Sequence, residues 1–253
     1  MERAQWDTFW VPEGTRVIDR DEILYISNPR PAFYLNQVFR TRPPRPRWPA
    51  LVEEVCTAHA HTTAMWTVFD TIDMSALDTL LADAGYTSLG ESDTMVIEVN
   101  KFRATSTDRV TVRQVRDRTR LVHHLSVMEE TFGTRVEHPE NELCELLRAC
   151  TGPTARVVRM VAYDRADEPI ATGAMNLYPE LSLGYLWGGS TLPHARGQGA
   201  YRALLDARIA YAQQRNISIV GVYAIRDTSA PILARHEFET CGVMTKWRRQ
   251  PAG

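Results

Sequence analysis

The fold of this chain is decided by the stretch Ser190-Thr191-Leu192-Pro193-His194-Ala195-Arg196-Gly197-Gln198-Gly199-Ala200-Tyr201. An apolar run with strand character, residues 181–189, precedes it, and residues 201–212 follow with apolar side chains at helical spacing. The first N–H groups of a helix have no intrahelical partner, and the helix dipole adds positive charge at that end. The loop's glycines let an anion approach the backbone closely, and Arg196 adds a fixed positive charge. The pattern predicts a loop that binds a diphosphate at a helix start.

Other phosphate-binding loops do not fit this stretch. A dinucleotide fingerprint needs three glycines in its own spacing and an early strand, whereas this loop lies late in the chain. A Walker loop needs Gly-Lys followed by Ser or Thr, which the stretch lacks. Taken alone, the loop also fits a glycine-containing turn that binds no ligand.

The loop and its surroundings resemble the GCN5-related N-acetyltransferase (GNAT) superfamily. Residues 196–201, Arg-Gly-Gln-Gly-Ala-Tyr, resemble the family's coenzyme A loop, and residues 191–193 resemble the end of its fourth strand. Residues 217–225 resemble its fifth strand, and residues 229–238 resemble the helix that usually ends in Gly-Phe. The resemblance covers about residues 108–247.

Two residues depart from the family pattern, since Tyr201 replaces the last small residue of the loop and Glu237 replaces the helix-ending glycine. The resemblance implies an α+β fold (mixed α/β) with a splayed, mixed and mainly antiparallel sheet flanked by helices. It also implies acetyl-CoA, or another acyl-CoA, as co-substrate. The residues at the family's coenzyme A positions are Gly189, Ser190, Thr191, Arg196, Gly197, Gln198, Gly199, Ala200, Tyr201 and Ser229.

Acyl transfer from a thioester to an amine needs a polarised carbonyl, a neutral and well-aimed amine, and a thiolate that can leave. The resemblance implies that the pantetheine arm of the coenzyme lies between the splayed fourth and fifth strands. There Gly188-Gly189 would permit a bulge that aims a backbone N–H at the acyl carbonyl oxygen. Two glycines at a strand end also fit a simple turn.

The sequence does not reveal an obvious general acid or base. Members of the family often carry Glu on the fourth strand and Tyr on the last helix, and the matching positions here are Leu183 and Leu233. Tyr223, His236 and Glu180 are catalytic candidates by location only. Glu180 also fits a solvated loop acid and His236 a packing residue, and an amine of low pKa needs only positioning.

Glu129 and Glu130 lie on the first predicted helix of the second domain, where the resemblance implies acceptor specificity. Adjacent residues project to different sides of a helix, so at most one of the pair faces a site. A carboxylate suits a cationic amine, although such a pair also fits the solvated face of an amphipathic helix. Both residues are therefore candidates for binding a small-molecule amine acceptor.

The overall composition excludes several classes of protein. A net charge of −2 argues against a nucleic-acid-binding surface, and no apolar run approaches the roughly 18 residues that cross a bilayer. Residues 1–10 are polar where a signal peptide is apolar, and the spacing of Cys144 and Cys150 is not that of a zinc site. We expect a cytoplasmic monomer or homodimer with no metal, no nucleic-acid partner and no membrane partner.

The 253 residues are enough for two domains. We predict an N-terminal domain over residues 1–104 and a catalytic domain that binds acyl-CoA over residues 105–253, with a polar boundary rich in Thr and Ser. The N-terminal order of strands and helices resembles that of the second domain but has no Arg-Gly-x-Gly loop. It fits a degenerate GNAT-like copy, and it also fits an unrelated α+β cap.

The catalytic domain has the predicted order strand–helix–helix–strand–strand–strand–helix–strand–helix, with a hairpin turn at residues 164–169. The leading hypothesis is transfer of an acetyl or other short acyl group from coenzyme A to an amine by direct attack in a ternary complex. One alternative is a coenzyme A-binding sensor or partner protein without transferase activity. Another is a different acyl-CoA reaction on the same scaffold.

Overall fold

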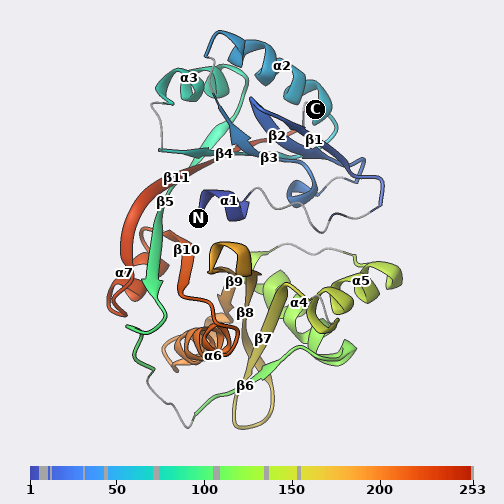
Figure 1. The fold of residues 1–253 in the computed structure, drawn as a ribbon. Coiled ribbons are helices and arrows are strands. Elements are labelled where there is room, and N and C mark those ends of the chain that lie inside the picture. The colour runs from blue at the N-terminus through green and yellow to red at the C-terminus, as the bar shows by residue number, and fades with distance from the viewer. Residues whose placement is uncertain are drawn as a thin grey trace. The chain divides into compact units, whose positions relative to one another are not determined.

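The structure is a computed structural model, shown in Figure 1, whose contacts group into two compact units. The described residues are 1–5, 11, 13–30, 32–42, 45–70, 74–104, 109–133, 137–152 and 155–251. Unit 1 comprises residues 1–95, 224–232 and 240–253, and unit 2 comprises residues 96–223 and 233–239. The polar boundary segment expected from the sequence includes residues 105–108, which lie outside the described residues.

Unit 1 is built on a mixed sheet with strand order β1-β2-β3-β4-β11-β5. Strands β1, β2 and β3 pair antiparallel, β3 and β4 pair parallel, and β4 and β11 pair antiparallel. The strands are β1 (Arg16–Arg20), β2 (Ile23–Ser27), β3 (Gln37–Thr41), β4 (Ala64–Phe69), β5 (Thr87–Glu98) and β11 (Glu239–Arg249), and the helices are α1 (Glu2–Gln5), α2 (Trp48–Ala58) and α3 (Ser75–Asp83).

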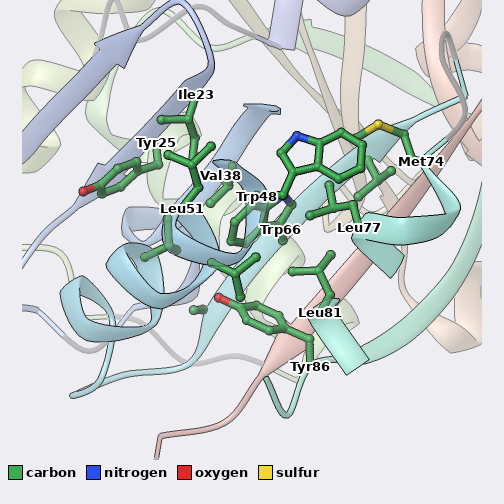
Figure 2. Packing of buried hydrophobic residues seen from close by; sticks show 14 residues of the cluster. Ile23, Tyr25, Val38, Trp48, Leu51, Trp66, Met74, Leu77, Leu81 and Tyr86 are labelled. Atoms are coloured by element: carbon green, nitrogen blue, oxygen red, sulfur yellow. The ribbon is translucent and has the colours of Figure 1, made fainter. Parts of the chain in front are cut away.

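The core of unit 1 forms where α2 and α3 pack on this sheet. Every residue of β4 is buried, which is the pattern of a strand covered on both faces. Trp48 of α2 and Trp66 of β4 are both fully buried, and Figure 2 shows them surrounded by side chains from β2, β3 and α3. Helix α2 has a proline in its first turn, where the missing N–H costs no hydrogen bond.

Unit 2 is built on a sheet with strand order β10-β9-β8-β7-β6. All its neighbouring strands are antiparallel except β9 and β10, which are parallel. These two pair only from Ile219↔Leu183 to Val222↔Leu186, although β9 continues to Thr191, so they separate toward their carboxyl ends. The strands are β6 (Thr111–Gln114), β7 (Val157–Tyr163), β8 (Pro169–Tyr178), β9 (Leu183–Thr191) and β10 (Ile219–Ile225). The predicted splayed, mainly antiparallel sheet is confirmed.

Helices α4 and α6 cover opposite faces of the unit 2 sheet. Thr172 of β8 hydrogen bonds to His124 of α4, whereas the next residue, Gly173, lies against Arg208 of α6. Successive residues of a strand face opposite sides, so the two helices lie on different faces. The helices of this part of the chain are α4 (Arg118–Phe132), α5 (Glu140–Thr151), α6 (Ala200–Gln214) and α7 (Ser229–Ala234).

The predicted element order from β6 to α7 is confirmed, including the hairpin between β7 and β8. The loosely alternating sequence of residues 33–40 predicts a strand. Residues 37–41 do form β3, but residues 33–35 form a 3-10 turn, so the prediction is wrong at its start. The reason is Asn36, whose side-chain amide donates to Arg30 O and Ala32 O and whose Oδ1 accepts from Asn28 N, holding the chain in a local turn.

The contact-based units differ from two consecutive segments divided at residue 104. Strand β11 pairs with β4 over Met244↔Phe69 to Arg249↔Ala64, so the end of the described chain completes the sheet of unit 1. Residues 96–104 group with unit 2 instead. The division into domains at residue 104 stays a prediction.

Candidate active site

The loop after β9 has the backbone shape that the glycines allow. Gly197 and Gly199 have φ values of 76° and 86°, in the left-handed region that side-chain-bearing residues avoid. The first intrahelical bond of α6 runs from Ala203 N to Gly199 O at 2.9 Å, so the N–H groups of residues 200–202 come before it. Arg196 is exposed beside them. The arrangement is an anion-binding helix start with an added cation.

A β-bulge lies at the Gly188-Gly189 pair of β9. The register with β8 runs from Ala174↔Trp187 to Thr172↔Ser190, so two glycines oppose the single residue Gly173. Gly188 has a φ of 61°, which glycine adopts without strain. The predicted bulge is therefore present, at the part of β9 that has separated from β10. Its backbone N–H groups are free of the regular ladder and can serve a ligand.

Two polar side chains follow the bulge along β9 without hydrogen-bond partners. Ser190 Oγ and Thr191 Oγ1 are buried and accept or donate no hydrogen bond within the described part of the chain. A buried hydroxyl without a partner is costly and uncommon. These two atoms fit a polar ligand that lies along the end of β9.

Tyr201, in the first turn of α6, packs its ring against Gly189 of the bulge. A Cβ placed on Gly189 would lie 3.1 Å from Tyr201 Cε2, so a larger residue at position 189 would require the ring or the bulge to shift by a few tenths of an ångström. Burial raises the pKa of the Tyr201 hydroxyl, so it stays protonated at neutral pH. The tyrosine that departs from the family pattern packs under the bulge.

On the face covered by α4, the bulge is bordered by large side chains. A Cβ on Gly188 would lie 3.4 Å from Met128 Cε, and Trp187 Nε1 donates to Asn176 Oδ1 at 2.7 Å. Tyr185 of β9 and Tyr223 of β10 meet edge to face with ring centroids 5.8 Å apart. Sequence reasoning named only Tyr223 among these, although Tyr185 and Trp187 alternate on β9 and could have been assigned to one face.

His124 is a buried neutral histidine. Thr172 Oγ1 donates to Met160 O at 2.8 Å, so the hydrogen between Thr172 and His124 is donated by His124 Nδ1. Burial, followed by the nearby charge of Arg159, holds the pKa of this imidazole well below its usual range. The Nδ1 atom of the preceding residue, His123, lies 3.0 Å from the hydroxyl of Tyr163 on β7.

The two positions that carry acid and base in the resembled family are apolar and buried here. Leu183 is 6% exposed and Leu233 is fully buried. Glu180 is exposed and pairs with Arg156 at 3.2 Å, ahead of the first residue of β9, whereas the bulge lies near the end of that strand. His236 lies edge to face with Phe102, and its pKa is lowered, chiefly by burial and next by Arg202.

The acceptor candidates on α4 differ in exposure. Glu129 is half-buried with its Oε1 3.7 Å from His138 Nε2, whereas Glu130 is exposed. His138 Nδ1 also lies 3.1 Å from Glu142 Oε1 of α5. Ser229 Oγ accepts a hydrogen bond from Ile225 N at 2.9 Å, where it holds the start of α7.

Arg208 was not singled out by sequence reasoning. It lies on α6 one turn after Leu204, at the spacing of that helix's apolar face, and is 1% exposed. A charge at an apolar-face position is the sequence signal that could have marked it. Among the described residues, no helix is long and apolar enough to span a membrane, and no group of three His, Cys, Asp or Glu side chains could hold a metal.

Much of unit 2 matches a known protein-family model. Residues 122–242 match the family model described as the acetyltransferase (GNAT) family. No curated protein sequence matches the chain significantly.

Solved structures resemble the whole chain in fold. A GCN5-related N-acetyltransferase from Kribbella flavida has a TM-score of 0.66 at 14% identity, with 100% of this chain and 96% of that chain covered. One from Sphaerobacter thermophilus has a TM-score of 0.64 at 16% identity, covering 100% and 90%. A tandem GNAT protein from the clavulanic acid biosynthesis pathway has a TM-score of 0.58 at 12% identity, covering 100% and 88%. The predicted fold class, two-part and GNAT-like, is confirmed.

Proposed function

Because residues 122–242 match the acetyltransferase (GNAT) family model, we propose that this chain transfers an acetyl or other short acyl group from coenzyme A to an amine of a small molecule. The observation that carries the proposal is the sequence of features along β9: a bulge at Gly188-Gly189, two unpartnered buried hydroxyls, and a left-handed glycine loop at the start of α6. A thioester, a pantetheine arm and a diphosphate occur in this order in an acyl-CoA.

Each feature has a task in binding the co-substrate. The N–H groups at the start of α6, the glycines of the loop and Arg196 suit the diphosphate, because the helix end and the guanidinium both favour negative charge. Gln198, Ala200 and Tyr201 complete this loop. Ser190 and Thr191 suit the amides of the pantetheine arm. Ser229 is proposed as a further contact of that arm.

The transfer itself is a direct attack. The amine nitrogen forms a bond to the thioester carbon, the C–S bond breaks, and the thiolate leaves with its electron pair. The proton lost by the nitrogen goes to solvent or to the thiolate. The Gly189 N–H, released from the ladder by the bulge, is suited to stabilise the negative charge that develops on the carbonyl oxygen.

Proton transfer has several candidate residues, and in this proposal the main source of the rate enhancement is the positioning of the amine against the thioester. Leucines occupy both positions that carry acid and base in the family. Tyr223 is the candidate on the separating strand β10, and His236 and Glu180 are secondary candidates. Glu129 and Glu130 are proposed to attract a cationic acceptor. The same two leucines favour a second function, a coenzyme A-binding protein that performs no transfer.

Ligand-induced stabilisation and thiol release separate these functions. We expect coenzyme A to raise the Tm of the protein, and acetyl-CoA with a panel of amines to release free thiol. Arg196→Ala should weaken coenzyme A binding about tenfold by removing a charge from the diphosphate site, at roughly 1.4 kcal/mol. Arg215→Ala is the matched control, since it removes an exposed arginine at the other end of α6, about 22 Å along the helix.

Stabilisation by coenzyme A without thiol release from any amine would favour the binding protein. Absence of any stabilisation, with Arg196→Ala indistinguishable from wild type, would refute both functions.

A further inference from the structure

Arg208 of α6 is a buried cation without a carboxylate partner. It is 1% exposed, Nε donates to Leu204 O at 3.0 Å, and Nη1 donates to Ala174 O at 3.2 Å. No acidic side chain in the described part of the chain pairs with it, and burial lowers the pKa of its guanidinium. An arginine keeps its charge even so, because its ordinary pKa lies far above neutrality. Burying such a charge without a counter-ion is costly for stability.

The guanidinium lies directly under the bulge. A Cβ on Gly173, the residue opposite the bulge, would lie 2.8 Å from both Cζ and Nη1 of Arg208. A Cβ on Gly189 would lie 4.0 Å from Nη2. The charge therefore lies against Gly173 of β8 and close to Gly189 of β9, at the point where the register of the two strands shifts.

The field of Arg208 also reaches the opposite face of the sheet. Burial and then the charge of Arg159 are the main causes of the lowered pKa of His124, which packs on that face against Thr172, and the charge of Arg208 adds to them. A positive charge in an interior of low dielectric acts over such distances because little solvent screens it. Negative charge that develops at the bulge would be stabilised by the same field.

We propose that Arg208 is a positioning residue that fixes the bulge through Ala174 O and polarises the acyl carbonyl bound there. The inference rests on the proposed function, since it concerns the thioester of a bound acyl-CoA. In this role, the buried Arg208 destabilises the folded protein but stabilises the negative charge that develops on the carbonyl oxygen during transfer.

The test uses the infrared stretch of acetyl-CoA labelled with 13C at the carbonyl, bound to the full-length protein. This readout needs no acceptor amine, and it reports the polarisation of the carbonyl directly. We compare wild type with Arg208→Met, which keeps length and apolar fit, and Arg208→Lys, which keeps the charge. Gly173→Ala is a second route, because its Cβ must displace the guanidinium while Arg208 remains in the chain.

Arg159→Met is the matched control. Arg159 is also buried in unit 2, at 6% exposure. Its Nη1 donates to Leu146 O and Cys150 Sγ at α5 and its Cζ lies 5.4 Å from the centroid of the Trp187 ring, whereas Arg208 donates to Ala174 O, so the control tests a second buried charge near β9 that is bonded to α5. We expect this variant to keep most of the carbonyl shift.

In wild type we expect the bound carbonyl to absorb at lower wavenumber than free acetyl-CoA. Arg208→Met should lose at least half of that shift, Arg208→Lys should keep most of it, and coenzyme A affinity should change less than threefold. The Tm of Arg208→Met should be equal to or above that of wild type, an outcome that a merely structural arginine would not give.

A full carbonyl shift in Arg208→Met, or in Gly173→Ala if Arg208→Met does not fold, overturns the inference. Equal loss of the shift in the Arg159→Met control also overturns it. If wild type binds coenzyme A but shows no carbonyl shift, this inference fails and the proposed function stands. If wild type does not bind coenzyme A, the proposed function itself fails and takes the inference with it.

Discussion

His59, at the end of α2 in unit 1, should make the stability of the protein depend steeply on pH. The ring is fully buried, its Nε2 donates to Ile26 O at 2.8 Å, and it packs edge to face with Tyr25 at 5.7 Å. Its Nδ1 is buried without a hydrogen-bond partner among the described residues. An imidazolium would place a second N–H on that atom with nothing to accept it. Burial accordingly lowers the pKa of His59 from 6.5 to about 4.

The sign of the effect follows from which state binds the proton. Above pH 6.5 the imidazole is neutral in both states and contributes nothing to the pH dependence. Between pH 6.5 and about 4, His59 is protonated in the unfolded chain but neutral in the folded chain, so the free energy of unfolding falls as the pH falls. The gap of about 2.5 pH units, 6.5 minus about 4, corresponds to a total loss of about 3 kcal/mol. About 2 kcal/mol of this loss is already present at pH 5.

Urea unfolding at a series of pH values between 7.5 and 5 measures this loss. His59→Gln is the informative variant, because its amide can still donate to Ile26 O but does not titrate. We expect His59→Gln to be less stable than wild type at pH 7.5, and to lose about 2 kcal/mol less than wild type on going to pH 5. Parallel curves of stability against pH for the two proteins would refute the reasoning.

Three further predictions concern unit 2. Glu237 has a φ of 64°, so Glu237→Gly should raise the free energy of unfolding by about 1 kcal/mol, measured by urea denaturation; a loss of stability would contradict it. Gly189→Ala should slow thiol release from acetyl-CoA at least tenfold, because its Cβ meets Tyr201 at 3.1 Å and shifts the N–H of the bulge; an unchanged rate would argue against the bulge as the carbonyl site. Ser190→Ala should leave the Tm of the ligand-free protein unchanged or raised, since the hydroxyl has no partner among the described residues, and should weaken coenzyme A binding roughly fivefold in calorimetry. Equal affinities of Ser190→Ala and wild type would remove this residue from the site.

The features that the sequence revealed are those that depend on local backbone chemistry. Gly188-Gly189 predicted a bulge, and the register of β8 with β9 contains one. Glu237 stood where a glycine usually ends a helix, and it has the positive φ of such a position. Glycine meets the backbone requirement of the bulge directly, whereas at position 237 the requirement is indicated by the glycine that the resembled family usually has there.

The features that the sequence did not reveal depend on contacts between distant segments. Nothing in the neighbourhood of Arg208 on α6 indicates that its guanidinium meets Gly173 of β8. Strand β1 was not predicted because its residues are mostly exposed, as is usual for an edge strand, and carry no apolar pattern. Strand β11 was not predicted because its partner, β4, lies far away in the sequence, and the sequence near a strand does not indicate its pairing with a distant one.

The place of β11 between β4 and β5 has a consequence for the order of folding during synthesis. Residues 64–98 are synthesised long before residues 239–249, so the sheet of unit 1 lacks the strand between β4 and β5 until β11 has been made. Until then, β4 presents an apolar edge able to pair with other chains. Unit 2 has most of its strands in continuous sequence and can form earlier. The segment synthesised first is thus among the last to reach its final structure, and dependence on chaperones should fall on unit 1.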